Sequence, residues 1–230
     1  KKRGLAVELS CSLTPVLPAL LGRVRHLFDL NARPDLIADR LKRQAALARA
    51  VAQNPGLRVP GAFDGFELAL RAVLGQQVTV KAATTLAGRL AETFGDPVET
   101  PYPELNRLSP APERIAAAKL RKLTDLGIVG SRAQSLLALA RDVFAGRLVL
   151  EAGAPPDQIL PKLLELRGIG PWTAHYIAMR ALRWPDAFPK EDLALRKKLG
   201  GASPAQAEAL SQAWRPWRSY ATLHLWGAPK

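Results

Sequence analysis

The stretch that decides the fold is residues 162–195, KLLELRGIGPWTAHYIAMRALRWPDAFPKEDLAL. An apolar helical pattern runs into the turn Gly168-Ile169-Gly170, and Pro171 suits the first position of the helix that follows. A loop punctuated by prolines then leads to Asp192, at the predicted start of a third helix. We therefore expect two helices joined by a tight glycine turn, and then a carboxylate at a helix N-terminus.

The glycine turn has a structural and a functional interpretation. In the structural one, it is an ordinary turn between helices in which Ile169 fills the core. In the functional one, the uncovered backbone amides of Gly168, Gly170 and Trp172 bind a DNA phosphate without reading sequence. The chain carries 33 Lys and Arg against 20 Asp and Glu, a net charge of +13. This excess favours a polyanionic partner and hence the functional interpretation.

Aromatic and acidic residues follow the turn. Trp172 and Tyr176 are four positions apart and share one helix face. The carboxylate of Asp192 is suited to stabilise positive charge on a sugar or to activate water. Its simpler role is to cap helix 193–199, and the two roles are compatible. Glu191 is the competing acid, and the spacing from the glycine turn favours Asp192.

The remainder of the chain reads as nearly all-α. Residues 5–11 alternate as a strand does, and residues 35–52 have the periodicity of one helix. Short connections rich in Pro and Gly are typical of a two-lobed irregular helical bundle with a remnant strand at the N-terminus. We predict an N-terminal remnant over 1–55, a helical lobe over 56–150, and a lobe over 151–230 that contains the hairpin and the acid.

Several classes of protein are excluded by composition. The single cysteine, Cys11, rules out an intrachain disulfide or a cluster held by several thiolates. Three scattered histidines do not form a metal-ligand spacing, and no apolar run approaches a membrane span. We expect a monomeric, soluble, cytoplasmic protein without a membrane segment and without a required cofactor.

Three motifs together resemble the helix-hairpin-helix (HhH-GPD) DNA glycosylases. LRGIGPWTAHYIAMRAL, followed by FPKEDLAL, is similar to the hairpin and aspartate of that superfamily. GLRVPGAFDGFELALRAVLGQQVTVKAA at 56–83 and WRPWRSYATLHLW at 214–226 resemble its alkylated-base branch, the 3-methyladenine DNA glycosylase II (AlkA) type. The likeness extends over about residues 4–227. By this resemblance, we expect the β-rich N-terminal domain of that type to be largely missing from the sequence.

The resemblance implies a function and a set of roles. The function is base excision repair, in which bases such as 3-methyladenine and 7-methylguanine are flipped from double-stranded DNA and released by hydrolysis of the N-glycosidic bond. Asp192 matches the essential aspartate. Trp172, Tyr176 and Trp226 match an aromatic pocket, which is suited to the flat cation of an alkylated purine.

The resemblance also implies contacts with DNA and with an ion. The residues expected to bind DNA lie in a wedge loop and in the hairpin: Gln76, Gln77, Arg167, Gly168, Gly170 and Thr173. The second wedge position is apolar in the AlkA type and is Gln77 here. The backbone carbonyls that match a site for Na⁺ or K⁺ are those of Leu164, Leu166 and Ile169.

Two other functions remain open from the sequence. One is a helix-hairpin-helix module that binds DNA without catalysis. The other is a bifunctional glycosylase and lyase for oxidised bases, in which an amine attacks the sugar. In the lyase-capable relatives a lysine matches Trp172, so the amine nucleophile is absent and the resemblance implies a monofunctional enzyme that leaves an abasic site.

Overall fold

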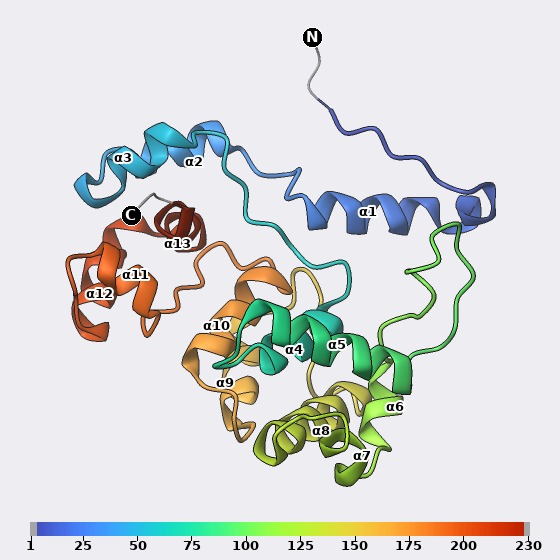
Figure 1. Cartoon of the computed structure of the whole chain (residues 1–230). Helices are drawn as coiled ribbons and strands as arrows, with labels where there is room; N and C mark the ends of the chain where they lie inside the picture. Colours follow the sequence, from blue (N-terminus) through green and yellow to red (C-terminus); the bar gives the residue numbers. More distant parts are fainter. Residues whose placement is uncertain (1–3, 228–230) are drawn as a thin grey trace.

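The computed structural model describes residues 4–227, whose regular secondary structure is almost entirely helical (Figure 1). Thirteen α-helices and two short 3₁₀ helices are found within these residues. In chain order the elements are η1 (Cys11–Val16), α1 (Leu17–Leu27), α2 (Pro34–Leu41), α3 (Ala45–Gln53), α4 (Gly65–Leu74), α5 (Val80–Phe94), α6 (Pro112–Ala116), α7 (Leu120–Thr124), α8 (Gly130–Phe144), α9 (Pro156–Glu165), α10 (Pro171–Arg180), α11 (Leu193–Lys198), α12 (Pro204–Ser211), η2 (Gln212–Trp214) and α13 (Arg218–Gly227).

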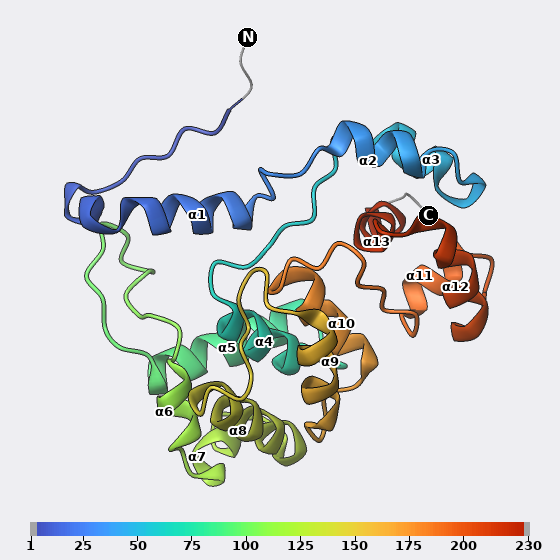
Figure 2. The same ribbon diagram turned by 180° about the vertical axis from the view of Figure 1, so that it is seen from behind.

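The helices gather into two lobes, as the two opposite views show (Figures 1 and 2). In the first lobe α4 packs against α5, α8 and α10, and α9 packs against α10. In the second lobe α13 packs against α3 and α11, and α2 packs against α3. The predicted hairpin lobe, residues 151–230, is therefore divided: α9 and α10 belong to the first lobe, and α11 and α13 belong to the second. The expected two-lobed helical fold is confirmed.

The first lobe is built around the contact between α4 and α10. Asp64 begins α4, and its carboxylate accepts a hydrogen bond of 2.7 Å from the backbone N–H of Glu67. Ala69 on α4 and Ala174 and Ala178 on α10 are buried, and side chains this small let two helix backbones approach closely. This contact places the N-terminal end of α10, which carries Trp172, on a rigid support.

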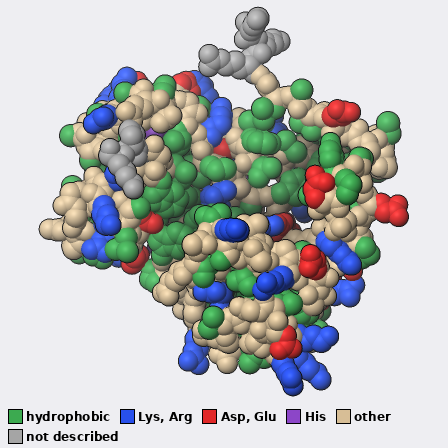
Figure 3. Space-filling view, viewed as in Figure 1, with side chains coloured by type: hydrophobic (Ala, Val, Ile, Leu, Met, Phe, Trp, Pro, Cys, Tyr) green, Lys and Arg blue, Asp and Glu red, His purple; other side chains and the backbone are tan. Residues whose placement is uncertain are grey.

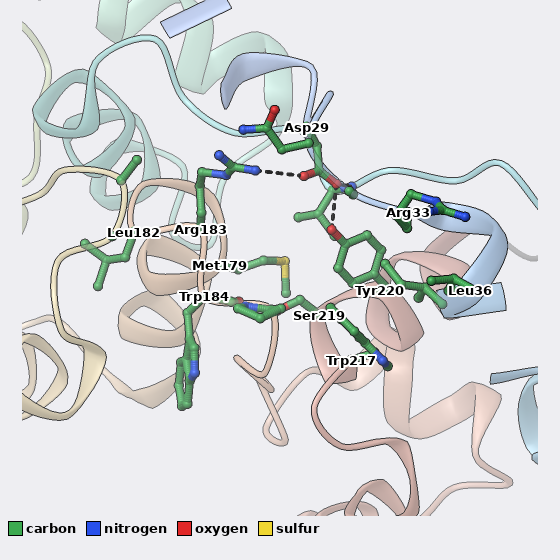
Figure 4. Close-up of a pocket in the computed structure, with 17 residues that line it drawn as sticks. Asp29, Arg33, Leu36, Met179, Leu182, Arg183, Trp184, Trp217, Ser219 and Tyr220 are labelled. Atoms are coloured by element: carbon green, nitrogen blue, oxygen red, sulfur yellow. Dashed lines mark hydrogen bonds and ion pairs between the residues drawn. The ribbon is translucent and has the colours of Figure 1, made fainter. Parts of the chain in front are cut away.

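The two lobes are joined by a clamp around the buried carboxylate of Asp29 (Figure 4). One oxygen accepts from Arg183 at 3.2 Å, and the other accepts from the hydroxyl of Tyr220 at 2.7 Å and from the N–H of Val59 at 3.2 Å. The partners come from the segment before α4, the loop after α10, and α13. The clamp borders a cavity of about 580 Å³ between the lobes, which Met179 also lines.

Two local expectations are wrong. Residues 5–10 have no regular secondary structure and Cys11 begins η1, and among residues 4–227 the only β-bridge joins Pro97 and Arg107. The predicted strand 5–11 does not form because a strand needs a neighbour to satisfy its amides and carbonyls. The helix predicted over 35–52 is divided into α2 and α3, since Gln44 adopts an extended conformation with ψ of 118°.

The loop from α10 to α11 is supported by His175. Its Nδ1 accepts a hydrogen bond of 3.3 Å from the N–H of Phe188, and its ring stacks on Trp184 with 5.9 Å between centroids. The acceptor role requires that Nδ1 carry no proton. Burial, followed by the positive charge of Arg218, lowers the pKa of His175 from 6.5 to about 4.

We expect the fold to lose stability as the pH falls from about 6.5 towards 4, in part through His175. The unfolded chain takes up a proton on this histidine over that range and the folded chain does not, so acid favours unfolding. From pH 7 to pH 5 the contribution is about 2 kcal/mol. Urea unfolding at the two pH values measures it. His175→Asn keeps an acceptor but does not titrate, so its stability should depend less on pH. An unchanged pH dependence in this variant would contradict the assignment.

Candidate active site

Asp192 stands at the N-terminus of α11, where three N–H groups donate to its carboxylate. Oδ1 accepts from the backbone of Leu195 at 2.7 Å and from the indole of Trp226 at 3.2 Å. Oδ2 accepts from the indole of Trp172 at 2.7 Å. The predicted capping role is confirmed, and the indole contacts come in addition to it. The carboxylate is therefore fixed in orientation by groups from α10, α11 and α13.

The aromatic side chains form a wall beside this carboxylate. Trp172 and Tyr176 stack with 5.3 Å between ring centroids and 7° between planes. Trp226 approaches Asp192 from the other lobe, so the structure brings the four predicted residues together. Hydrophobic side chains gather in the hollow between the lobes (Figure 3). The arrangement offers aromatic surface next to a fixed negative charge.

Arg180 also belongs to this cluster, although no sequence motif indicated it. Its Nη1 donates to the hydroxyl of Tyr176 at 2.9 Å, and its Cζ lies 5.5 Å from the centre of the Tyr176 ring. The same guanidinium donates to the carbonyls of Pro60 and Gly61 in the segment before α4. The spacing of four residues from Tyr176 along α10 is a signal that would have found it. Arg180 fixes the outer end of the tyrosine ring.

The hairpin turn requires glycine at position 168 and exposes the start of α10. Gly168 has φ of +87°, and a Cβ at this position would lie 2.2 Å from the Oγ of Ser135, so only glycine fits. Ile169 is buried, as the structural interpretation of the turn predicts. Gly170 is exposed and begins α10, whose first amides have no partner within the helix. Arg167 is exposed next to the turn.

The two glutamines of the wedge loop differ in their surroundings. Gln77 is exposed, with φ of +54°. Gln76 is partly buried, and its amide nitrogen donates to the carbonyl of Gly168 at 2.9 Å and to the Oγ1 of Thr173 at 3.0 Å. Thr173 is itself buried. The structure therefore brings Gln76, Gly168 and Thr173 together and leaves Gln77 at the surface.

Residues 4–227 contain neither a side-chain cluster suited to a metal ion nor a helix suited to span a membrane. No cluster of three His, Cys, Asp or Glu side chains in this range is arranged to hold a metal ion. None of the helices in the described part is long and apolar enough to cross a bilayer. At the hairpin, the carbonyl of Leu166 accepts a hydrogen bond of 2.9 Å from Ile169, and the cation site predicted at Leu164, Leu166 and Ile169 stays a prediction.

Comparison with protein families gives two matches that together cover most of the chain. Residues 70–218 match the model of the HhH-GPD superfamily base excision DNA repair proteins, and residues 1–64 match the AlkA N-terminal domain. The first match includes the wedge loop, the hairpin and Asp192. The second covers η1 to α3 and the segment before α4.

Individual relatives agree with the family models. The chain is 37% identical over 222 residues to DNA-3-methyladenine glycosylase 2 of Escherichia coli (strain K12), which covers 96% of this chain and 76% of that protein. It is 45% identical over 211 residues to the probable bifunctional transcriptional activator/DNA repair enzyme AlkA of Mycobacterium tuberculosis (strain CDC 1551 / Oshkosh). That alignment covers 89% of this chain and 42% of the relative, so the chain spans less than half of that protein.

A solved structure agrees with the fold. The 3-methyladenine DNA-glycosylase from Archaeoglobus fulgidus superposes with a TM-score of 0.74 at 19% identity, over 95% of this chain and 75% of that one. At this identity the likeness supports the fold alone. The family assignment depends on the extent of the sequence matches, and the range 70–218 includes Trp172, Tyr176 and Asp192. The chain belongs to the HhH-GPD superfamily of base excision DNA repair proteins.

Proposed function

We propose that this protein is a monofunctional DNA glycosylase that removes alkylated bases, of the 3-methyladenine and 7-methylguanine type, from double-stranded DNA. The observation that carries the proposal is the Asp192 carboxylate, held by the indoles of Trp172 and Trp226 beside the stacked ring of Tyr176. The relatives named as DNA-3-methyladenine glycosylases support the same activity.

The geometry suits the cleavage of a glycosidic bond to a cationic base. Electron-rich ring faces attract a flat cation, and the base that N-alkylation makes cationic is also a good leaving group. As the bond breaks, positive charge develops on the deoxyribose, in the manner of an oxocarbenium ion. The fixed carboxylate of Asp192 stabilises that charge and orients the attacking water. The products are the free base and an abasic site.

The alternatives fit the site less well. A lyase needs an amine to form a Schiff base with the sugar, and Trp172 presents an indole N–H that is already donated to Asp192. A module that merely binds DNA needs the hairpin and the positive charge, but has no use for a carboxylate fixed between two indoles. The Asp192 cluster therefore favours hydrolysis over both.

DNA binding in this proposal begins at the hairpin. The amides at the start of α10 and the exposed Arg167 face the phosphates, and the chain's net charge of +13 attracts them from a distance. The protein acts as a monomer without a required cofactor. A sodium or potassium ion on the carbonyls of Leu164, Leu166 and Ile169 would add positive charge at the same place.

Asp192→Asn should lower the release of 3-methyladenine from methylated DNA by at least about a hundredfold, because the neutral amide does not stabilise the charged sugar. Base release is measured by chromatography of the free base. The product strand from the wild-type enzyme should stay intact until alkali is added, as expected without lyase activity.

Glu191→Gln is the matched control for that experiment. It makes the same change of charge one residue earlier, where no indole contacts the carboxylate, and should keep nearly full activity. If Asp192→Asn were as active as the wild type while Glu191→Gln was inactive, the catalytic role would belong to Glu191. If the wild-type protein bound methylated DNA without releasing any base, the alternative function, a module that binds DNA without catalysis, would be favoured.

Gly170→Ala should weaken DNA binding while the fold stays intact. A Cβ at Gly170 meets no atom within 4 Å, and its backbone, with φ of −86°, is open to any residue. We expect an affinity loss of about five- to tenfold, since the methyl group keeps a phosphate from the amides of α10. Fluorescence anisotropy with duplex DNA measures the affinity.

The control for the hairpin experiment is Gly22→Ala. Gly22 lies on α1, away from the hairpin, and a Cβ there also meets nothing within 4 Å. It should bind DNA as the wild type does. Equal affinities for wild type, Gly170→Ala and Gly22→Ala would show that the hairpin is only a structural turn.

A further inference from the structure

The side chain of Gln76 is directed at the hairpin. Its amide nitrogen reaches both sides of the hairpin turn, at the carbonyl of Gly168 and at the hydroxyl of Thr173. These acceptors lie 92 and 97 residues further along the chain. One amide therefore joins the wedge loop to the phosphate site and to the first turn of α10.

Helix α8 holds both sides of this junction. Arg132 donates to the backbone carbonyl of Gln76 at 2.6 Å. Ser135, one turn later on the same helix, donates to the carbonyl of Arg167 at 2.7 Å. Its Oγ also occupies the space that a Cβ of Gly168 would need. The wedge loop and the hairpin are thus anchored on the same helix.

Gln77 differs from its neighbour in exposure and in backbone conformation. It is exposed and has φ of +54°, in the left-handed region that L side chains seldom adopt. Such a conformation persists only where the surroundings impose it. The neighbouring residue, Gln76, is the one that the hairpin and α8 hold on both its side chain and its carbonyl.

We propose that Gln76, Arg132 and Ser135 are positioning residues that join the wedge loop to the hairpin, so that only Gln77 enters the duplex. The proposal rests on the glycosylase function proposed above. Binding of a backbone phosphate at the hairpin then fixes the place of Gln77 relative to the flipped nucleotide. If the hairpin binds the wrong phosphate, Gln77 is misplaced relative to the target nucleotide and does not enter the duplex. Base flipping then requires that the DNA be bound in the correct register.

The test compares one methylated base in two settings, paired within a duplex or unpaired in a bulge, where no wedge is needed to open the helix. Gln76→Met and Arg132→Met should each lower single-turnover release from the paired duplex about tenfold or more. Release from the bulge should stay close to that of the wild type. Equal losses on both substrates would indicate general damage to the fold and overturn the proposal.

Combining variants tests the coupling directly. If the junction and the wedge act as one unit, Gln76→Met with Gln77→Ala should lose no more than the more severe of the two single variants. Losses that multiply would show that the two glutamines act independently, against the proposal. Gln134→Met is the matched control, because Gln134 is exposed on α8 between Arg132 and Ser135.

Insertion is also measured without chemistry, by the fluorescence of 2-aminopurine placed beside the lesion, which rises when stacking is disturbed. Wild type and Gln134→Met should raise the signal, and Gln76→Met should not. A signal equally high with Gln76→Met refutes the coupling whether or not any base is released. Absence of base release by the wild type on both substrates counts instead against the proposed glycosylase activity.

Discussion

The carboxylate of Asp192 is the point at which the two lobes meet around the site. Trp172 reaches it from α10, in the lobe built on α4, and Trp226 reaches it from α13, in the lobe built with α3. A backbone amide of α11 completes its set of donors. This one carboxylate therefore links the aromatic side chain of one lobe to that of the other. The carboxylate that carries the charge also holds the indoles of both lobes in position. A site of this kind is complete only when both lobes are in place.

Local chemistry predicted those elements whose ends carry their own signals. Pro171 opens α10 and Asp192 caps α11, both as the sequence indicated. The failures are also physical. Alternation over 5–11 describes one strand, but a strand exists through a partner that this pattern does not supply. The break between α2 and α3 falls at Gln44, where neither Gly nor Pro marks an end. Nothing in the local sequence accounts for it.

The site was predicted in its residues but not in its connections. The hairpin, Asp192 and the aromatic residues lie in short motifs, and the motifs identified them. The hydrogen bonds that hold these residues in place join segments far apart in the sequence. Arg180 and Pro60 are 120 residues apart, and Asp29 and Tyr220 are 191 residues apart. Hydrogen bonds between segments so far apart have no periodicity, and one sequence contains no trace of their pairing. Gln76 shows the consequence, since its motif suggests a wedge while its amide is bound to the hairpin.

The hydrogen bonds of the aromatic groups decide which of their surfaces remain for a ligand. An indole N–H and a phenol hydroxyl lie in the plane of their rings, and here those of Trp172, Trp226 and Tyr176 are engaged by Asp192 and Arg180. The stack uses one face each of Trp172 and Tyr176. What remains is ring face and the hydrogen of the Tyr176 hydroxyl, since that hydroxyl accepts from Arg180. Ring faces attract flat cations and make few demands on the edge pattern of a base. Under the proposed function, selection would depend on charge and on the strength of the glycosidic bond more than on hydrogen-bond matching.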